Sequence, residues 1–333
     1  MTSSILTESI FPMFGRVYDY PKRPSLDRRI TLNPKRPNVT GTSGNDTFIA
    51  NKGNYTIDGG NGNDTIDYSL LGQGVTIGAK GIITKGKLGI DTVKNIERII
   101  GAIGKTNTID GNATNGTMAS LNIDFAKNSF TVENLPGGAP NQVFDIFNFN
   151  QAIGTNNNDT MVGNNSGNCF IGGGGNDIIT GGTGNDILNG TDSNARGVGE
   201  VDILTGAGGV NTFILGDKTG AFYLGNGDSD YAFITDYDLT SDRIQLGAGK
   251  TDQLCYQLEN TGIIDIFVGQ QNGSEDLIAK VQLKNSFSTS YGKSPMGIGS
   301  NQMSVVGINE NGEFTFSTPA ISQNLQLTDT IFA

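Results

Sequence analysis

The chain has 333 residues, which is enough for two domains. Its 49 glycines and its hydrophobic content of 35% suit a stack of short strands better than a conventional globular domain. The formal net charge of −11 favours cation binding and disfavours non-specific binding to nucleic acid. The lack of histidine excludes catalytic triads, zinc proteases and general bases built on that residue, and two cysteines are too few for a disulfide framework.

Residues 1–40 have a composition of their own. They hold five of the nine prolines and seven of the 22 basic residues against three acidic ones, which gives this segment a net charge of +4 and the remainder −15. Proline at that density blocks helices and central strands, so the segment is predicted to be an extended arm. The arm has two interpretations: a leader whose charges are solvated, or a docking arm that binds the acidic face of a neighbouring copy or of another protein.

A nine-residue pattern begins at Gly41 and is clearest from Gly154 to Ile214. Each unit opens with glycine, has aspartate or asparagine at its sixth position and a large apolar residue at its eighth. Glycine reaches positive φ without steric cost, so positions one to six suit a turn and positions seven to nine a strand whose eighth side chain points inward. The eighth positions in this stretch are Met161, Phe170, Ile179, Leu188, Leu204 and Phe213.

Two units make one coil of about eighteen residues, and stacked coils share one apolar core. Stacking places each sixth-position side chain beside its equivalent in the next coil, and stacked carboxylates repel one another unless a cation lies between them. Oxygen ligands select a hard ion, and their flexible number favours Ca²⁺ over Mg²⁺. The predicted metal ligands are Asp46, Asp64, Asp159, Asp177, Asp186, Asp202, Asn168 and Asn211.

Some units depart from the pattern. Asn168 and Asn211 replace aspartate, and Glu200 stands where glycine is expected. Sites that use these turns are therefore expected to be weaker or empty. The unit at 50–58 has Tyr55 at its sixth position, which predicts no metal site on that edge of the roll.

The pattern is interrupted at 68–100 and at 112–153, where apolar alternation continues and predicts strands. We expect one continuous roll over 41–215 with two insertions that bind no metal. The alternative is a separate small domain at 112–150. Residues 216–333 lose the pattern and are predicted to form a β-rich capping and secretion region, which would cover the unpaired strand edges of the last coil.

The units at 172–180 and 181–189 follow the pattern G-G-x-G-x-D-x-U-x, which resembles that of the RTX (repeats-in-toxin, hemolysin-type) calcium-binding family. The resemblance implies an all-β fold, namely a right-handed parallel β-roll or β-solenoid of nonapeptide repeats with Ca²⁺ between the stacked turns. Residues 231–238 and 242–246 also resemble the segment that closes β-rolls in serralysin-type proteases and related secreted proteins.

The leading hypothesis is a non-enzymatic, calcium-binding, secreted structural or interaction protein whose β-roll folds on binding Ca²⁺. A second hypothesis is a self-assembling subunit of an extracellular filament, surface layer or scaffold, docked through residues 1–40. A third is an accessory module of an RTX hydrolase or alginate epimerase. The N-terminus lacks the pattern of a signal peptide and no window is apolar enough for a membrane span, so we expect either type I secretion, which the resemblance implies, or display at the cell surface.

Overall fold

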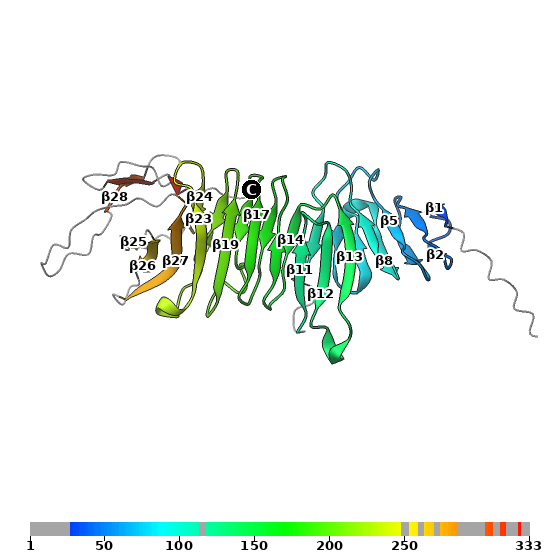
Figure 1. The fold of residues 1–333 in the computed structure, drawn as a ribbon, viewed down its shortest axis with the longest axis horizontal. Coiled ribbons are helices and arrows are strands. Elements are labelled where there is room, and N and C mark those ends of the chain that lie inside the picture. Colours follow the sequence, from blue (N-terminus) through cyan, green and yellow to red (C-terminus); the bar gives the residue numbers. More distant parts are fainter. Residues whose placement is uncertain are drawn as a thin grey trace, which may run out of the picture.

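The protein is elongated and all-β, and its strands follow one another along the long axis (Figure 1). The computed structural model describes residues 27–112, 118–247 and 274–284. Beyond residue 247 it also describes the strands β25 (Gln253–Leu258), β26 (Ile263–Gly269), β28 (Ser304–Ile308), β29 (Phe314–Ser317) and β30 (Gln326–Leu327). Short 3-10 helices are η1 (Ala79–Gly81), η2 (Gly86–Leu88), η4 (Pro136–Gly138) and η5 (Gly227–Ser229).

Two long sheets contain most of the strands, and successive strands of the repeats alternate between them. The first sheet has, in spatial order, β1 (Arg29–Thr31), β3 (Thr47–Ile49), β5 (Thr65–Asp67), β9 (Arg98–Ile100), β13 (Gln142–Phe147), β12 (Ser129–Glu133), β11 (Ser120–Asp124), β15 (Thr160–Val162), β17 (Ile178–Gly182), β19 (Val201–Ala207), β23 (Tyr231–Tyr237), β27 (Glu275–Leu283), β26 and β25.

The second sheet has β2 (Asn38–Thr40), β4 (Tyr55–Asp58), β8 (Ile90–Lys94), β7 (Ile82–Thr84), β6 (Thr76–Ile77), β10 (Thr108–Asp110), β14 (Gln151–Ile153), β16 (Cys169–Ile171), β18 (Ile187–Asn189), β20 (Thr212–Ile214), β24 (Arg243–Gln245) and β30. Two further sheets are small: β21 (Gly216–Asp217) pairs with β22 (Gly220–Ala221), and β28 pairs with β29.

The parallel pairing confirms the predicted coil. Met161, Ile179 and Leu204 are neighbours on β15, β17 and β19, and all three are fully buried between the sheets. The outward neighbours Ile178 and Ile203 are 48% and 37% exposed, as the alternation of a strand requires. One inward side chain per short strand therefore supplies the core, and the parallel sheets agree with the predicted β-roll. Its right-handed sense stays a prediction.

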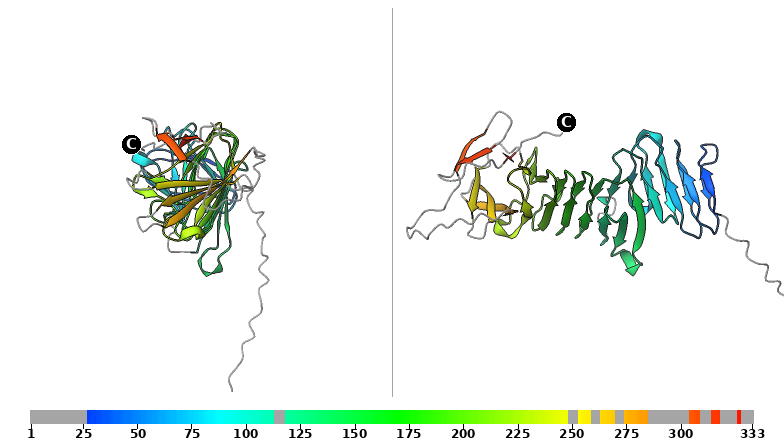
Figure 2. Two further views of the ribbon diagram at one scale, coloured as in Figure 1. Left: turned by 90° about the vertical axis from the view of Figure 1, so that its left-hand side faces the viewer. Right: turned by 45° about the horizontal axis from the view of Figure 1, so that its top comes forward.

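Each interruption of the repeat is a three-stranded antiparallel meander that lies within a sheet. Residues 76–94 form β6, β7 and β8, which run backward along the second sheet from the neighbour of β10 to the neighbour of β4. Residues 120–147 form β11, β12 and β13, which run backward along the first sheet from β15 to β9. Since each sheet gains one meander, both lengthen equally and stay side by side (Figure 2). Residues 120–147 are thus part of the roll and not a separate small domain.

The roll begins before Gly41 and continues past Leu215. Strand β1 pairs with β3 and β2 pairs with β4, so residues 27–40 form a coil and are not part of an arm. Pro34 and Pro37 adjoin the turn between these strands, where a missing N–H breaks no ladder. At the other end, β23 and β24 pair with β19 and β20. Residues 1–26 of the predicted arm and much of the predicted cap lie outside the described residues. No helix in the described ranges is long and apolar enough to cross a membrane.

A buried ion pair fixes the first meander to the coil beside it. The Lys85 ammonium lies 2.6 Å from Asp91 Oδ1, and neither side chain is exposed to solvent. Lys85 Nζ also donates to the Asn51 carbonyl at 2.9 Å and lies 4.7 Å from the centre of the Tyr55 ring. The Tyr68 hydroxyl donates to Asp91 Oδ2 at 2.9 Å. Burial raises the pKa of Asp91, and the lysine opposes that shift.

We expect Lys85→Met to lower the free energy of unfolding by about 3–5 kcal/mol, because it leaves the Asp91 charge buried without a cation. Urea unfolding at saturating calcium measures the change. The control is Lys94→Met, which removes a lysine that is 67% exposed and pairs with Asp58 at the surface. We expect the urea midpoint of this variant to be almost unchanged. Equal midpoints for Lys85→Met and the unmodified chain would contradict the role of the pair.

Candidate metal centre

The predicted ligands form two rows along the two edges of the roll. Because strands alternate between the sheets, turns that lead into the first sheet lie on one edge and turns that lead into the second lie on the other. All eight predicted side chains are buried. The first row contains Asp46, Asp64, Asp159, Asp177 and Asp202, and the second contains Asn168, Asp186 and Asn211.

Backbone hydrogen bonds connect each row from coil to coil. The Asp46 amide donates to Asp64 Oδ1 at 2.7 Å. The Asp159 and Asp177 amides donate to the Oδ1 atoms of Asp177 and Asp202 at 2.7 and 2.8 Å. In the second row, the same bond joins the Asn168 amide to Asp186 at 2.6 Å and the Asp186 amide to Asn211 at 3.1 Å. The predicted stacking is thus confirmed, and one oxygen of each stacked side chain is used to hold it.

The residue at position two of the turn decides the partner of the other carboxylate oxygen. Where this residue is threonine, its backbone N–H donates to the carboxylate: Thr42 to Asp46 Oδ2 at 2.5 Å, and Thr155 to Asp159 Oδ2 at 2.6 Å. The threonine hydroxyls donate to the same atoms. These two carboxylates therefore have hydrogen-bond partners on both oxygens.

Where position two is glycine, the carboxylate keeps an unpartnered oxygen. Gly60, Gly173 and Gly182 have φ values of 101°, 108° and 121°. Glycine adopts such φ values at little energetic cost. They rotate the backbone N–H of this residue relative to the rest of the turn. Three buried oxygens have no hydrogen-bond partner among the described residues in these turns, namely Oδ2 of Asp64, Asp177 and Asp186.

The surroundings of two of these oxygens, on Asp64 and Asp177, fit a hard cation. A Cβ built on Gly172 would collide with Asp177 Oδ2 and with the Gly190 carbonyl oxygen of the next coil. Gly59 stands in the same relation to Asp64 Oδ2 and the Asn95 carbonyl. These two opening glycines thus leave room beside a carboxylate oxygen and a carbonyl oxygen, which are the ligands of Ca²⁺. Since the described part has no group of three acidic, cysteine or histidine side chains placed to hold one metal ion together, backbone carbonyls would supply the remaining ligands.

The other predicted ligands have no free carboxylate oxygen. Asp202 Oδ2 accepts a hydrogen bond from the Tyr223 hydroxyl at 2.6 Å. Asn211 uses its amide group to donate to the Gly208 carbonyl at 3.2 Å. The Asn168 Nδ2 atom is buried and unpartnered in the described structure, but a nitrogen that carries two protons is not a cation ligand. Weaker or empty sites in these turns stay a prediction.

Sequence reasoning missed several residues that extend the rows. The Asp64 amide donates to Glu97 Oε2 at 2.7 Å, and the Asn211 amide donates to Asp242 Oδ1 at 2.8 Å. Both acidic residues lie two positions before a buried isoleucine, Ile99 or Ile244, which is the spacing of positions six and eight. That spacing could have revealed them although the glycines of the turn are lost.

Burial and stacking raise the pKa of several carboxyl groups. Burial raises the pKa of Asp159 and of Asp186 to about 6, and that of Asp202 to about 7. The pKa of Asp177 rises to about 10, through burial first and then through the charges of Asp202 and Asp159. In the absence of a cation, these groups therefore keep their protons to a higher pH than an ordinary aspartate does.

The stability of the calcium-free chain should fall as the pH rises. The ordinary pKa of these carboxyl groups is 3.8 and their folded values are higher. Their contribution is thus complete below about pH 4 and is lost as the pH passes about 6 to 7. We expect a higher urea midpoint at pH 5 than at pH 8 in chelator, and the reverse order in saturating calcium. A chelator midpoint that increases between pH 5 and 8 would contradict these shifts.

Thr155→Gly should create a further site, because it removes the hydroxyl and lets the second residue adopt the φ of Gly173. We expect about one additional bound Ca²⁺ per chain, measured by equilibrium dialysis, together with a lower stability in chelator. Thr183→Gly is the matched control, since Thr183 is exposed at position three of its turn. An unchanged number of bound ions in a folded Thr155→Gly variant would show that position two does not control occupancy.

Comparison with solved structures finds a similarity to the extracellular lipase LipA from Serratia marcescens. The sequences are 14% identical, the alignment covers 79% of this chain and 38% of the lipase, and the TM-score is 0.25. The chain therefore spans less than half the length of that lipase, and a likeness of this degree carries no argument about function. No curated protein sequence matches the chain.

The family model of the RTX calcium-binding nonapeptide repeat matches four copies, within residues 40–70 and 153–188. These two stretches contain the turns of Asp64, Asp177 and Asp186, in which the second glycine leaves a carboxylate oxygen without a partner. The same stretches also contain the turns of Asp46, Asp159 and Asn168, so the match covers turns with and without such an oxygen. The chain carries RTX calcium-binding nonapeptide repeats, and the ion that such repeats bind is Ca²⁺.

Proposed function

We propose that this chain is a secreted β-roll that folds on binding Ca²⁺ and serves as a structural or interaction protein, not as an enzyme. The observation that carries the proposal is the set of three buried carboxylate oxygens, on Asp64, Asp177 and Asp186, that have no partner in the described structure. A buried carboxylate without a partner is strongly unfavourable, so the folded turn favours a bound cation.

Folding and calcium binding are coupled through these carboxylates. Asp177 lies between the like charges of Asp159 and Asp202. When these groups are ionised and no cation is bound, their repulsion adds to the conformational entropy that a glycine-rich chain loses on folding. The ligands come together only in the roll, so the binding free energy contributes directly to folding. Extracellular calcium modules typically bind at about 10⁻⁴–10⁻³ M.

Secretion and a non-catalytic role complete the proposal. Proteins with RTX repeats are typically secreted. A chain that stays unfolded at low calcium could pass through a type I exporter and fold outside the cell, where calcium is abundant. A non-catalytic role is supported by the position of the acidic groups, which follow the edges of the roll in rows and bond to the backbone of the adjacent coil.

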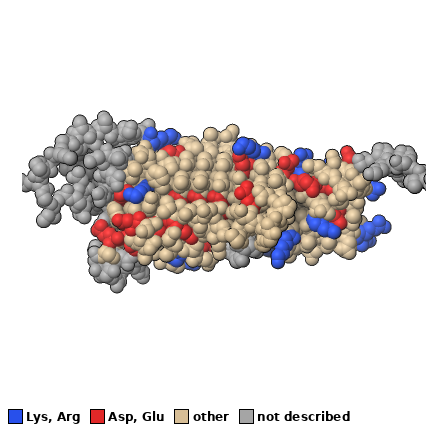
Figure 3. Space-filling model, turned by 60° about the horizontal axis from the view of Figure 1, so that its bottom comes forward, with Lys and Arg blue, Asp and Glu red and all other residues tan. Residues whose placement is uncertain are grey.

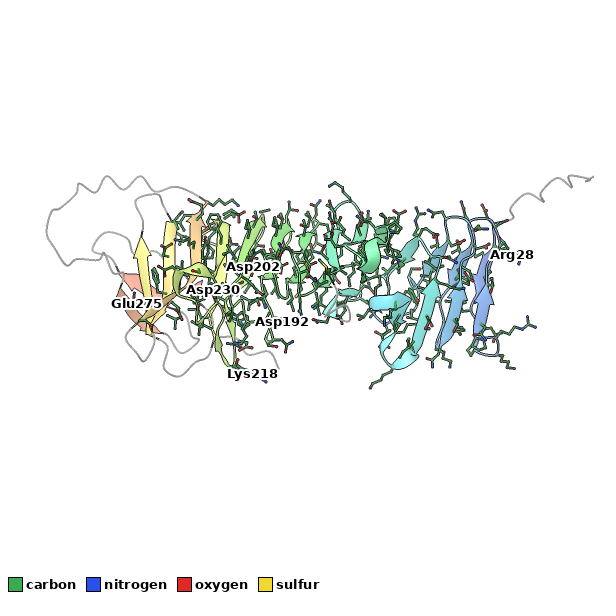
Figure 4. All side chains as sticks on the ribbon, turned by 90° about the horizontal axis from the view of Figure 1, so that it is seen from below. Arg28, Asp192, Asp202, Lys218, Asp230 and Glu275 are labelled. Carbon is green, nitrogen blue, oxygen red and sulfur yellow. The ribbon has the colours of Figure 1, made fainter. Side chains whose placement is uncertain are left out.

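Self-assembly is favoured by the separation of charge between the two ends of the roll. The first coil presents four exposed basic residues, Arg28, Arg29, Lys35 and Arg36. The opposite end presents the exposed acidic residues Asp228 and Glu275. Arg28 and Glu275 lie at opposite ends of the molecule (Figure 4), and Figure 3 shows that both ends of the face in view also present groups of the other sign. Complementary ends permit head-to-tail contacts, which generate filaments when they do not close into a ring.

Calcium titration into chelator-treated protein tests the proposal, with circular dichroism and light scattering recorded together. We expect β structure to appear with calcium at a midpoint that Asp177→Asn raises at least about tenfold, or about 1.4 kcal/mol. Asp145→Asn is the control, because that side chain is 48% exposed.

Two further outcomes separate the roles. Growth in particle size that accompanies the β signal, and that salt reverses, supports assembly through charged ends, whereas constant size supports a monomeric module. A chain that is fully folded in chelator, with a urea midpoint unaffected by calcium, would contradict calcium-coupled folding.

A further inference from the structure

A second acidic row begins where the repeat departs from its pattern. Glu200 occupies position four of its unit, where Gly175 stands one coil earlier. Asp230 occupies the same place one coil later, since Val201 pairs with Tyr231 and the Tyr231 amide donates to the Glu200 carbonyl at 3.1 Å. Position four carries no side chain in the turns of Asp64, Asp177 and Asp186. Two carboxylates are thus added to the first edge, close to its end.

Each of these carboxylates uses one oxygen and leaves the other unpartnered. Glu200 Oε1 accepts a hydrogen bond from the Gly175 amide at 2.9 Å, and Asp230 Oδ2 accepts one from the Gly199 amide at 2.8 Å. The remaining oxygens, Glu200 Oε2 and Asp230 Oδ1, are buried and have no hydrogen-bond partner among the described residues. Asp230 is 0% exposed, so water does not solvate its charge.

The loop at 190–196, which is inserted between two units, adds a third oxygen. Thr191 is 0% exposed, and its hydroxyl oxygen also has no hydrogen-bond partner in the described structure. Burial is the main cause that raises the pKa of Glu200, and Asp192 and Asp230 lie close enough to raise it further, while the Thr191 hydroxyl lies close enough to lower it. Figure 4 shows Asp192 and Asp230 at the same end of the roll as Asp202.

The basic group of this loop does not neutralise the two carboxylates. The Arg196 guanidinium donates to the Thr219 hydroxyl at 2.7 Å and to the Ala221 carbonyl at 2.8 Å, and it pairs with Asp217 at 3.4 Å. The Asp202 carboxylate of the first row, two residues from Glu200, accepts a hydrogen bond from the Tyr223 hydroxyl. The carboxylates of Glu200 and Asp230 and the hydroxyl of Thr191 thus lie together in a buried region. Neither Arg196 nor Asp202 brings a positive charge to it.

We propose that Glu200, Asp230 and Thr191 form a further divalent-cation site, outside the nonapeptide ligand positions, at the C-terminal end of the first edge. Its ligands are oxygens only, which selects a hard ion, and Ca²⁺ tolerates the irregular geometry that a glutamate, an aspartate and a hydroxyl from three segments impose. The ion would join the inserted loop to the coils of β19 and β23, and so hold the insertion against the roll.

The number of calcium ions bound per full-length chain tests the site. Equilibrium dialysis at saturating calcium is compared for the unmodified chain, the double variant Glu200→Gln and Asp230→Asn, the ladder variant Asp177→Asn, and the control Asp228→Asn with Glu275→Gln. The amide variants keep an acceptor oxygen for the Gly175 and Gly199 amides. We expect the double variant to bind about one ion fewer at unchanged circular dichroism, and the control, whose two residues are exposed, to match the unmodified chain.

The outcomes distinguish this site from the nonapeptide sites. A double variant that binds as many ions as the unmodified chain, while Asp177→Asn loses one, overturns this inference and leaves the proposed function in place. Loss of an ion from the double variant alone supports this site and contradicts the ladder sites. If the double variant does not fold, Thr191→Val decides: it changes no charge, and we expect it to weaken the binding of one ion at least about tenfold, whereas unchanged binding overturns the proposal.

Discussion

Burial of carboxylates in rows is the constraint on which the rest of the structure depends. The first row places Asp159, Asp177 and Asp202 in successive coils, each bonded through one oxygen to the backbone of the coil before it. The bond fixes the register of the sheets, and the same burial makes the charge of each carboxylate unfavourable. The contact that sets the register thus also buries a negative charge. Each turn that contains such a carboxylate must stabilise it with a proton, a cation or a hydrogen-bond donor.

Different turns of the roll stabilise their carboxylates in different ways. Threonine at position two supplies donors to Asp46 and Asp159, and Tyr223 supplies one to Asp202. Lys85 supplies a permanent positive charge to Asp91, at the edge where Tyr55 replaces the acidic residue. In the described nonapeptide turns with two opening glycines, those of Asp64, Asp177 and Asp186, one carboxylate oxygen is left to an ion. Segments that carry their own donors or cation thus alternate with the segments in which we propose that calcium neutralises the carboxylate.

The repeat predicts much of this from sequence, because a period of eighteen residues fixes both the register and the inward side chain. The stacks of Asp46 with Asp64 and of Asp159 with Asp177 follow from counting alone. The first coil was missed because residues 27–40 have no turn glycines, and pairing with β3 and β4 makes them strands. The meanders were expected as strands, but their backward direction depends on long-range pairing that local alternation does not encode. The partner of Asp202 was missed because Tyr223 lies 21 residues away.

The backward course of the two meanders has a consequence for the order in which the chain can fold. Strand β6 does not pair with the coil that precedes it; β7 and β8 follow and fill the space between β6 and β4. Strand β11 likewise precedes the strands that join it to β9. Growth by addition of one coil at a time is therefore interrupted at each meander, although β9 itself pairs directly with β5. The coils on either side can each propagate from a local nucleus, as in other repeat proteins, whereas the stretch between them must close as a single cooperative unit.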